Sequence, residues 1–311
     1  MSTANPHVDE SSIVNPFDGV NFAELERSLR RPRTLMDYLL SGLVTCMTLG
    51  ALVPLFSVVI MLFWRGGKKL SLAVFTQLPP APLEQGGGFG NAIVGTLIMV
   101  ALAVLMSVPV GLFTAIYIAQ ARESRLAEAV RFCAKVATGF PSILAGVFAY
   151  GAIVLLTGGY SALAGAIALS ILMLPTIILT AEDAIRMVPS RMKEAAIGMG
   201  ATTTQTVWMV LLPTAVPGIL TGVMLAVARA AGETAPLIFT ALFSNYWLWS
   251  HGRAELMQPT ASLAVLIYNF SGMPFENQVE LAWAAAFVLV LMVLAANLIG
   301  QSLSNRQMQQ N

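Results

Sequence analysis

The chain has 311 residues, of which 57% are hydrophobic and 11% are charged, and its mean hydropathy is +0.75. Soluble domains carry roughly 25% charged residues, so lipid is the expected solvent for much of this chain. The net charge of +1 gives no electrostatic reason to expect a nucleic-acid partner. His7 and His251 lie far apart, as do Cys46 and Cys133, and we expect neither a metal site nor a redox pair.

Six apolar segments are long enough to cross a bilayer, whose core of about 30 Å needs about 20 helical residues. They are Tyr38–Trp64, Asn91–Ala119, Phe132–Leu156, Tyr160–Ala181, Val210–Ala231 and Leu281–Ser302. Gly139, Pro141 and Gly146 interrupt the third segment. The first apolar run is too long for a signal peptide and should remain as a span. The sequence therefore predicts an all-α polytopic membrane protein with six transmembrane helices.

The spans divide the chain into three parts. A membrane domain over residues 38–302 is expected between an N-terminal tail, 1–37, and a C-terminal tail, 303–311. Within the first tail, Phe22–Arg31 is expected to form a surface helix.

Lysine and arginine are divided unequally between the two membrane sides. Six spans place both termini on one side, and twelve cations fall on that side: Arg27, Arg30, Arg31, Arg33, Arg122, Arg125, Arg131, Lys135, Arg186, Arg191, Lys193 and Arg306. Four fall on the other side: Arg65, Lys68, Lys69 and Arg253. The positive-inside rule then predicts that both termini are cytoplasmic. The cluster Arg65–Lys69 runs against the rule.

The connection between the fourth and fifth spans, residues 182–212, carries a regular pattern. It reads E-A-A-x-x-x-G from Glu194 to Gly200 and, after nine intervening residues, V-x-L-P from Val210 to Pro213. A proline–serine pair ending at Ser190 predicts the start of a short amphipathic helix. We expect Glu194 in the first turn of this helix, where a carboxylate interacts favourably with the helix dipole.

The end of this short helix is also predicted. Gly198 and Gly200 should break it, and the chain should re-enter the membrane near Pro213. Ala195 and Ala196 carry so little side chain that another protein can approach the helix closely.

One arginine and one glutamate, Arg229 and Glu233, lie at the outer end of the fifth apolar segment. Charge at membrane depth is costly and usually marks a functional site. On a helix with about 100° per residue, both share one narrow sector with Gly218 and Gly222, a G-x-x-x-G pair that permits close helix approach. A planar guanidinium can donate two parallel hydrogen bonds to an oxyanion. The alternatives are an ion pair that serves packing alone and an arginine that extends to the outer interface of the membrane. The acidic pair Glu182–Asp183 is interpreted as a solvated helix end.

Two of these segments resemble one family. The E-A-A-x-x-x-G and V-x-L-P pattern resembles the EAA signature of the bacterial binding-protein-dependent ABC importer permeases. The segment R-A-A-G-E-T-A-P, from Arg229 to Pro236, is similar to that of the A-type permeases of phosphate-specific transport systems. The similarity extends over Gly90–Leu97, Pro141–Phe148 and Leu174–Glu182.

The resemblance implies the type I ABC importer (MetI-like) permease fold and two sets of functional residues. The residues implied to dock onto a separate ATPase are Glu194, Ala195, Ala196, Gly200 and Pro213. Those implied to line the substrate pathway are Arg229, Glu233 and Thr234, with Gly218 and Gly222 expected in helix packing.

The implied partners are a C-type permease, a dimer of the B-type ATPase and an external phosphate-binding protein, all at the bacterial inner membrane. The chain lacks a Walker A loop, since Gly66–Lys69 is missing the first glycine and the Ser or Thr after the lysine. We therefore expect no cofactor on this chain, and ATP and magnesium on the partner ATPase.

Three alternatives remain open. Sulfate or molybdate is possible because an arginine by itself specifies only an oxyanion. A membrane-embedded enzyme would need a cluster of polar catalytic residues within the spans, which the sequence does not show. A standalone channel would not explain a loop that docks onto an ATPase.

Overall fold

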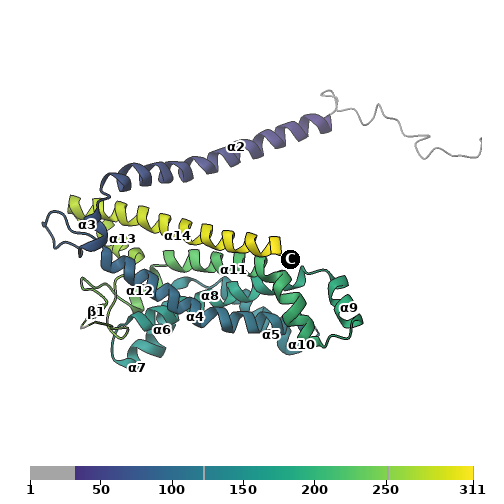
Figure 1. The fold of residues 1–311 in the computed structure, drawn as a ribbon. Coiled ribbons are helices and arrows are strands. Elements are labelled where there is room, and N and C mark those ends of the chain that lie inside the picture. Colours follow the sequence, from purple (N-terminus) through teal and green to yellow (C-terminus); the bar gives the residue numbers. More distant parts are fainter. Residues whose placement is uncertain (1–31, 122, 251, 311) are drawn as a thin grey trace, which may run out of the picture. The chain divides into compact units, whose positions relative to one another are not determined.

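The computed structural model describes residues 32–121, 123–250 and 252–310 (Figure 1). Over these residues the chain is helical apart from one short hairpin and the connecting loops. The predicted surface helix Phe22–Arg31 lies outside them. The chain forms two compact units, Met1–Val59 and Ile60–Asn311, and most of α2 (Pro32–Met61) belongs to the first.

Five helical segments of the described chain are long and apolar enough to cross a membrane. They are α2 continued by the π-helical turn η2 (Leu62–Gly66), α4 (Gly90–Gln120), α8 (Ala162–Arg186), the run of α10 (Thr203–Thr206), η4 (Val207–Leu211) and α11 (Leu212–Gly232), and α14 (Glu276–Gln310). These segments confirm five of the six predicted spans. The last helix continues through the predicted C-terminal tail as far as Gln310.

The third predicted span is bent rather than straight. Helix α5 (Arg125–Thr138) is followed by α6 (Ser142–Ala149), with an angle of 106° between the two halves. Pro141 causes the break, because its extended backbone (φ −57°, ψ 131°) precedes the first residue of α6. The predicted interruption of this span at Pro141 is therefore confirmed, whereas the helix begins at Arg125 and not at the predicted Phe132.

The second half of this bent span continues through two short segments. These are η3 (Tyr150–Val154) and α7 (Leu155–Thr157). The segment ends at Gly158, whose φ of +77° lies in the left-handed region that favours glycine. Gly146, expected to interrupt the span, instead lies inside α6.

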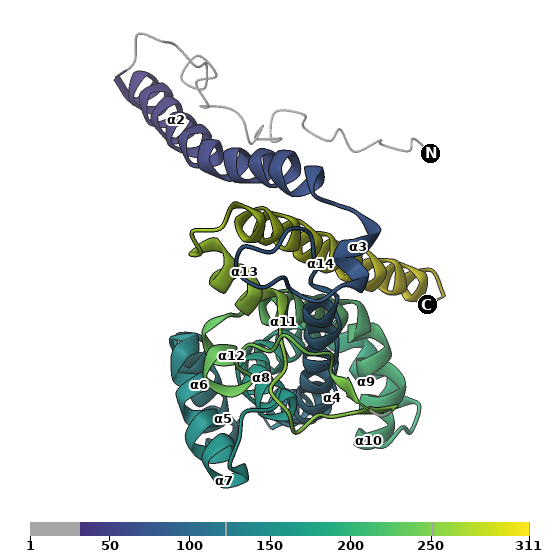
Figure 2. The same ribbon diagram turned by 90° about the vertical axis from the view of Figure 1, so that its left-hand side faces the viewer.

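Helix α8 is the centre of the second unit. It packs against α4, α5, α6, α11 and α12, and Figure 2 shows it among these neighbours. Its buried face combines small residues with larger apolar ones, including Leu169, Met173 and Ile177. Because lipid tails are as apolar as these side chains, close packing between the helices holds such a bundle together in a membrane.

Buried amides organise one end of the second unit. Asn91 donates to the backbone carbonyls of Ser244 and Tyr246 at 2.9 and 3.3 Å. Asn277 donates to the carbonyls of Glu84 and Gly86 at 2.9 and 3.0 Å. These bonds tie long loops to the starts of α4 and α14.

The same end of the unit carries the shorter elements. They are α3 (Leu72–Thr76), α12 (Ala235–Thr240), the antiparallel strands β1 (Trp249–Ser250) and β2 (Arg253–Ala254), and α13 (Leu263–Ser271).

The opposite end carries α9 (Ser190–Gly198) and α10 (Figure 1). A capping box starts α10: Thr202 Oγ1 accepts from the Gln205 amide at 3.3 Å, and the Gln205 side chain accepts from the Thr202 amide at 2.9 Å. The fifth span therefore begins at Thr203, so the predicted start at Val210 was wrong. The helix passes Pro213 because the π-helical turn η4 comes directly before α11.

Candidate functional site

The Arg229–Glu233 ion pair lies at the end of the fifth span. Arg229 Nε donates to Glu233 Oε1 at 3.2 Å. Helix α11 ends at Gly232, and Glu233 has an extended backbone (φ −74°, ψ 124°). Thr234 then precedes the first residue of α12. The ion pair and Thr234 therefore lie together at the point where the helix breaks. A break in a helix at membrane depth is tolerated where the backbone is buried in protein or lines a water-filled cavity.

Helix α11 exposes one line of residues, which we call the Arg229 stripe. It consists of Thr214, Thr221, Leu225, Arg229 and Gly232. Both threonine hydroxyls donate to carbonyls of their own helix, at 2.7 and 3.0 Å. The Arg229 side chain is 44% exposed and that of Glu233 is 15% exposed. Because charged side chains within membrane spans almost always face the bundle interior or a water-filled cavity, the stripe should face protein or water.

The G-x-x-x-G pair lies against α8. A Cβ atom added to Gly218 would be 2.8 Å from Ala184 Cβ, and one added to Gly222 would be 2.6 Å from Thr180 Cβ. Gly222 is buried while Arg229 is exposed. The helix sector that was predicted to hold Gly218, Gly222, Arg229 and Glu233 is therefore the boundary between two faces of α11. One face packs on α8 and the other carries the Arg229 stripe.

Helix α12, directly after the ion pair, is fixed by a second close approach. A Cβ atom on Gly146 of α6 would lie 2.6 Å from Pro236 Cα. The glycine thus allows the two helices to touch through their backbones. This contact joins the bent third span to the end of the fifth, and so places the backbone next to Thr234.

The short helix α9 starts at Ser190, with Pro189 before it, as expected. Glu194 is its fifth residue and lies beyond the first turn, so that part of the prediction was wrong. Glu194 and Ala195 are exposed, whereas Ala196 is buried. Ala196 was expected to add to the open surface of α9 together with Ala195. It instead packs α9 onto its own chain.

The turn after α9 depends on one glycine. Gly200 has φ +88°, and its amide donates to the carbonyl of Ile197 at 2.9 Å. An L side chain rarely adopts this backbone conformation. Gly198 has no such constraint. Gly200 thus fixes the direction in which the chain leaves α9 and enters α10.

A cavity of about 550 Å³ lies behind α9, between it and the ends of α4 and α8. Lys193 bridges it, with Nζ 3.4 Å from Gln120 Oε1. The exposed side of α9 carries apolar side chains as well, since Ile197 is exposed and Met199 beside it is 83% exposed.

Glu182 is the residue whose environment the sequence did not reveal. It was expected at a solvated helix end, but its side chain is only 3% exposed. Arg131 Nε donates to Glu182 Oε1 at 2.8 Å, and Arg186 Nη2 lies 2.6 Å from the same oxygen. Its neighbour Asp183 is exposed, as expected. In the sequence, Arg131 and Arg186 contribute only to the count of positive charges, and nothing links them to Glu182.

The fold and these sites define a multi-pass membrane permease. Residues 107–309 match the family model of the binding-protein-dependent transport system inner membrane component. The chain belongs to this family.

Curated relatives agree with this assignment. The chain is 38% identical to the phosphate transport system permease protein PstA of Yersinia pestis, over 76% of this chain and 79% of that protein. It is 38% identical to PstA of Haemophilus influenzae, over 78% of this chain and 88% of that protein. A probable PstA of Methanocaldococcus jannaschii is 33% identical, over 85% and 92%.

Solved structures of ABC importers share the fold. A chain of a bacterial alginate ABC transporter superposes with a TM-score of 0.61, at 16% identity, over 88% of this chain and 96% of that chain. A chain of the inward-facing MetNI methionine ABC transporter gives a TM-score of 0.53 at 20% identity, over 70% and 93%. The predicted MetI-like permease fold is thereby confirmed.

Proposed function

We propose that this chain is a permease subunit of an ATP-driven importer of inorganic phosphate and forms half of the translocation pathway. The observation that carries the proposal is the Arg229–Glu233 ion pair on an exposed stripe of a membrane span. A guanidinium stays charged when desolvated and presents parallel donors that match phosphate oxygens. The names of the relatives from Yersinia pestis and Haemophilus influenzae support the same substrate.

Glu233 favours phosphate over other oxyanions. In the absence of substrate it pairs with Arg229. When phosphate displaces it from the guanidinium, its carboxylate can accept a hydrogen bond from a protonated phosphate oxygen, and the hydroxyl of Thr234 is next to it in the chain. Sulfate and molybdate carry no proton near neutral pH, so the half-buried carboxylate of Glu233 would only repel them.

The Arg229 stripe has to be covered in the working transporter. A second permease with a matching polar stripe would enclose the pathway and remove Arg229 from lipid. We assign this role to the C-type permease of the same transport system.

The coupling partner is an ATPase dimer that holds ATP and magnesium. Glu194, Ala195 and Gly200 would contact it at or just after the exposed side of α9, while buried Ala196 positions the helix. Pro213, inside the fifth span, would carry the movement along it. The apolar exposure of Ile197 and Met199 suits a surface that is covered by another protein.

The orientation follows from charge. Arg131 and Lys135 lie on α5, Arg186 ends α8, and Arg191 and Lys193 lie on α9. The positive-inside rule then assigns the end that carries α9 to the cytoplasm, and an even number of spans would put both termini on that side of the membrane. The external phosphate-binding protein would then dock at the end that carries β1 and α13.

Anion competition tests the proposed substrate. Membrane vesicles that contain this chain, the second permease and the ATPase are supplied with the loaded binding protein outside and ATP inside. Labelled phosphate should accumulate only with ATP, and excess unlabelled phosphate should abolish the signal while equal amounts of sulfate or molybdate leave it. ATP-dependent accumulation of sulfate or molybdate in place of phosphate would overturn the assignment.

A further inference from the structure

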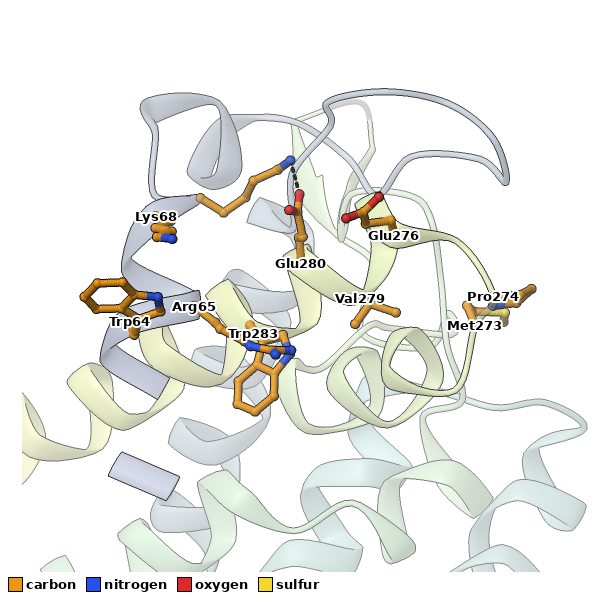
Figure 3. Close-up of a pocket in the computed structure, with 10 residues that line it drawn as sticks. Trp64, Arg65, Lys68, Met273, Pro274, Glu276, Val279, Glu280 and Trp283 are labelled. Atoms are coloured by element: carbon orange, nitrogen blue, oxygen red, sulfur yellow. Dashed lines mark hydrogen bonds and ion pairs between the residues drawn. The ribbon is translucent and has the colours of Figure 1, made fainter. Parts of the chain in front are cut away.

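A charged cavity lies apart from the cavity behind α9. Its lining includes no residue of the Arg229 stripe or of α9. It has a volume of about 630 Å³ and is formed where the segment after η2 meets the first turns of α14 (Figure 3). Three cations line it: Arg65, Lys68 and Lys69. The transport function proposed above uses none of them.

The two walls of this cavity are held together closely. A Cβ atom on Gly66 would lie 2.6 Å from the carbonyl oxygen of Trp283 and 2.7 Å from Phe287 Cβ. The rings of Phe63 and Phe287 meet edge to face, with centroids 4.8 Å apart. The cavity is therefore a built feature of the η2–α14 junction.

The three cations of this cavity differ in their interaction partners. Lys69 forms an ion pair with Glu280. Arg65 and Lys68 have no carboxylate partner among the described residues; they lie over the indole rings of Trp283 and Trp64, at 5.5 and 4.8 Å from the ring centroids. Figure 3 shows both cations on the η2 side of the cavity. Two cations without a carboxylate partner on one wall suit a phosphate group.

The surroundings place that phosphate on a lipid. Tryptophan is enriched at the membrane–water interface, and Trp64 and Trp283 both line this cavity. Along α14 from Trp283, the side chains of Val290, Leu294 and Leu298 are exposed and apolar, at helical spacing. A polar cavity that continues into an apolar helix face matches a headgroup and its acyl chain.

The opposite side of the cavity specifies the headgroup. Glu276 lies there, away from Lys68 (Figure 3), and has no ion-pair partner in the described part of the chain. A carboxylate attracts an ammonium group. A primary ammonium can donate hydrogen bonds to this carboxylate, whereas a quaternary ammonium has no N–H to donate.

We propose that this cavity binds a phospholipid with a primary-amine headgroup, with its phosphate against Arg65 and Lys68 and its ammonium against Glu276. Such a lipid binds at the junction of η2 and α14 and is a structural ligand of the membrane domain.

Native mass spectrometry of the full chain released from nanodiscs tests this. Discs contain either phosphatidylethanolamine, phosphatidylglycerol or phosphatidylcholine. We expect retained phosphatidylethanolamine to exceed the other two, and Arg65→Gln combined with Lys68→Gln to lower its retention about tenfold. Arg65→Lys should retain it. Arg253→Gln removes an exposed cation outside the cavity and should change nothing.

Three results would overturn the proposal. The first is full lipid retention by the double variant, with its folding verified by circular dichroism. The second is displacement of the adduct by millimolar inorganic phosphate, which would define a site for a free anion. The third is an unchanged headgroup preference in Glu276→Gln.

Discussion

Arg131 on α5 donates to Glu182 on α8 at 2.8 Å, and the same arginine donates through Nη2 to the carbonyl of Ile118 on α4 at 3.2 Å. One side chain thus joins three helices at the end of the bundle that carries α9. Arg186, the last residue of α8, contacts the same carboxylate oxygen. Glu182 is therefore the point at which an ion-pair network joins α5 to the end of α8, from which the chain leads on to α9.

Neutralising Glu182 should destabilise the chain. Glu182→Gln leaves two arginines facing a neutral amide at a buried position, and breaking such a pair costs about 3 kcal/mol. Thermal unfolding of the detergent-solubilised chain measures the effect as a lowered midpoint. Asp183→Asn is the matched control, because Asp183 is the exposed neighbour on the same helix. Equal midpoints for the two variants would show that the Glu182 contacts contribute no stability.

The contact between α11 and α8 leads to a size-exchange prediction. Gly218→Ala would place a methyl group 2.8 Å from Ala184 Cβ, and overpacking of this kind costs about 1–3 kcal/mol. Adding Ala184→Gly returns the space and should restore the unfolding midpoint of the solubilised chain.

Gly232→Ala is the control for this exchange, because an added Cβ there meets nothing within 4 Å. If Gly218→Ala leaves the midpoint unchanged, or if Ala184→Gly does not rescue it, the close approach of the two helices at this point is not a stabilising contact.

The turn after α9 leads to different predictions for Gly198 and Gly200. Gly200→Ala forces an L side chain into a left-handed backbone at a cost of about 1 kcal/mol, which should turn α9 away from its docking geometry. We expect roughly fivefold weaker co-purification of the ATPase, since 1.4 kcal/mol corresponds to a factor of ten. Gly198→Ala, with no positive φ and open space around it, should co-purify normally. The coupling role fails if both variants behave alike.

Local sequence signals predicted much of this architecture. Apolar length identifies a membrane helix because every backbone group must be satisfied within the segment, and five spans follow from it. The helix start at Ser190 and the turn at Gly200 also follow from local backbone preferences. The same reasoning missed the earlier start of the fifth span, because the capping box at Thr202 has no apolar signature.

Other features depend on contacts between distant segments. Glu182 is buried because α4, α5 and α8 converge on it, which no pattern within one helix reveals. Gly146 was predicted to interrupt a helix, but it is needed for the close approach of α6 to Pro236. The exposure of Arg229 beside buried Gly222 likewise depends on which neighbour α11 packs against.

The central claim is tested most directly by Arg229→Gln in the assembled transporter. Uptake of labelled phosphate is measured in vesicles that contain all subunits, with co-purification of the ATPase and the second permease as the measure of assembly. Since replacing one charged partner at a transport site removes about 1.5–3 kcal/mol or more of phosphate interaction, uptake should fall at least tenfold while assembly stays intact. Arg125→Gln, which removes an exposed arginine of α5, should transport normally. Wild-type phosphate uptake by an assembled Arg229→Gln complex would contradict the account.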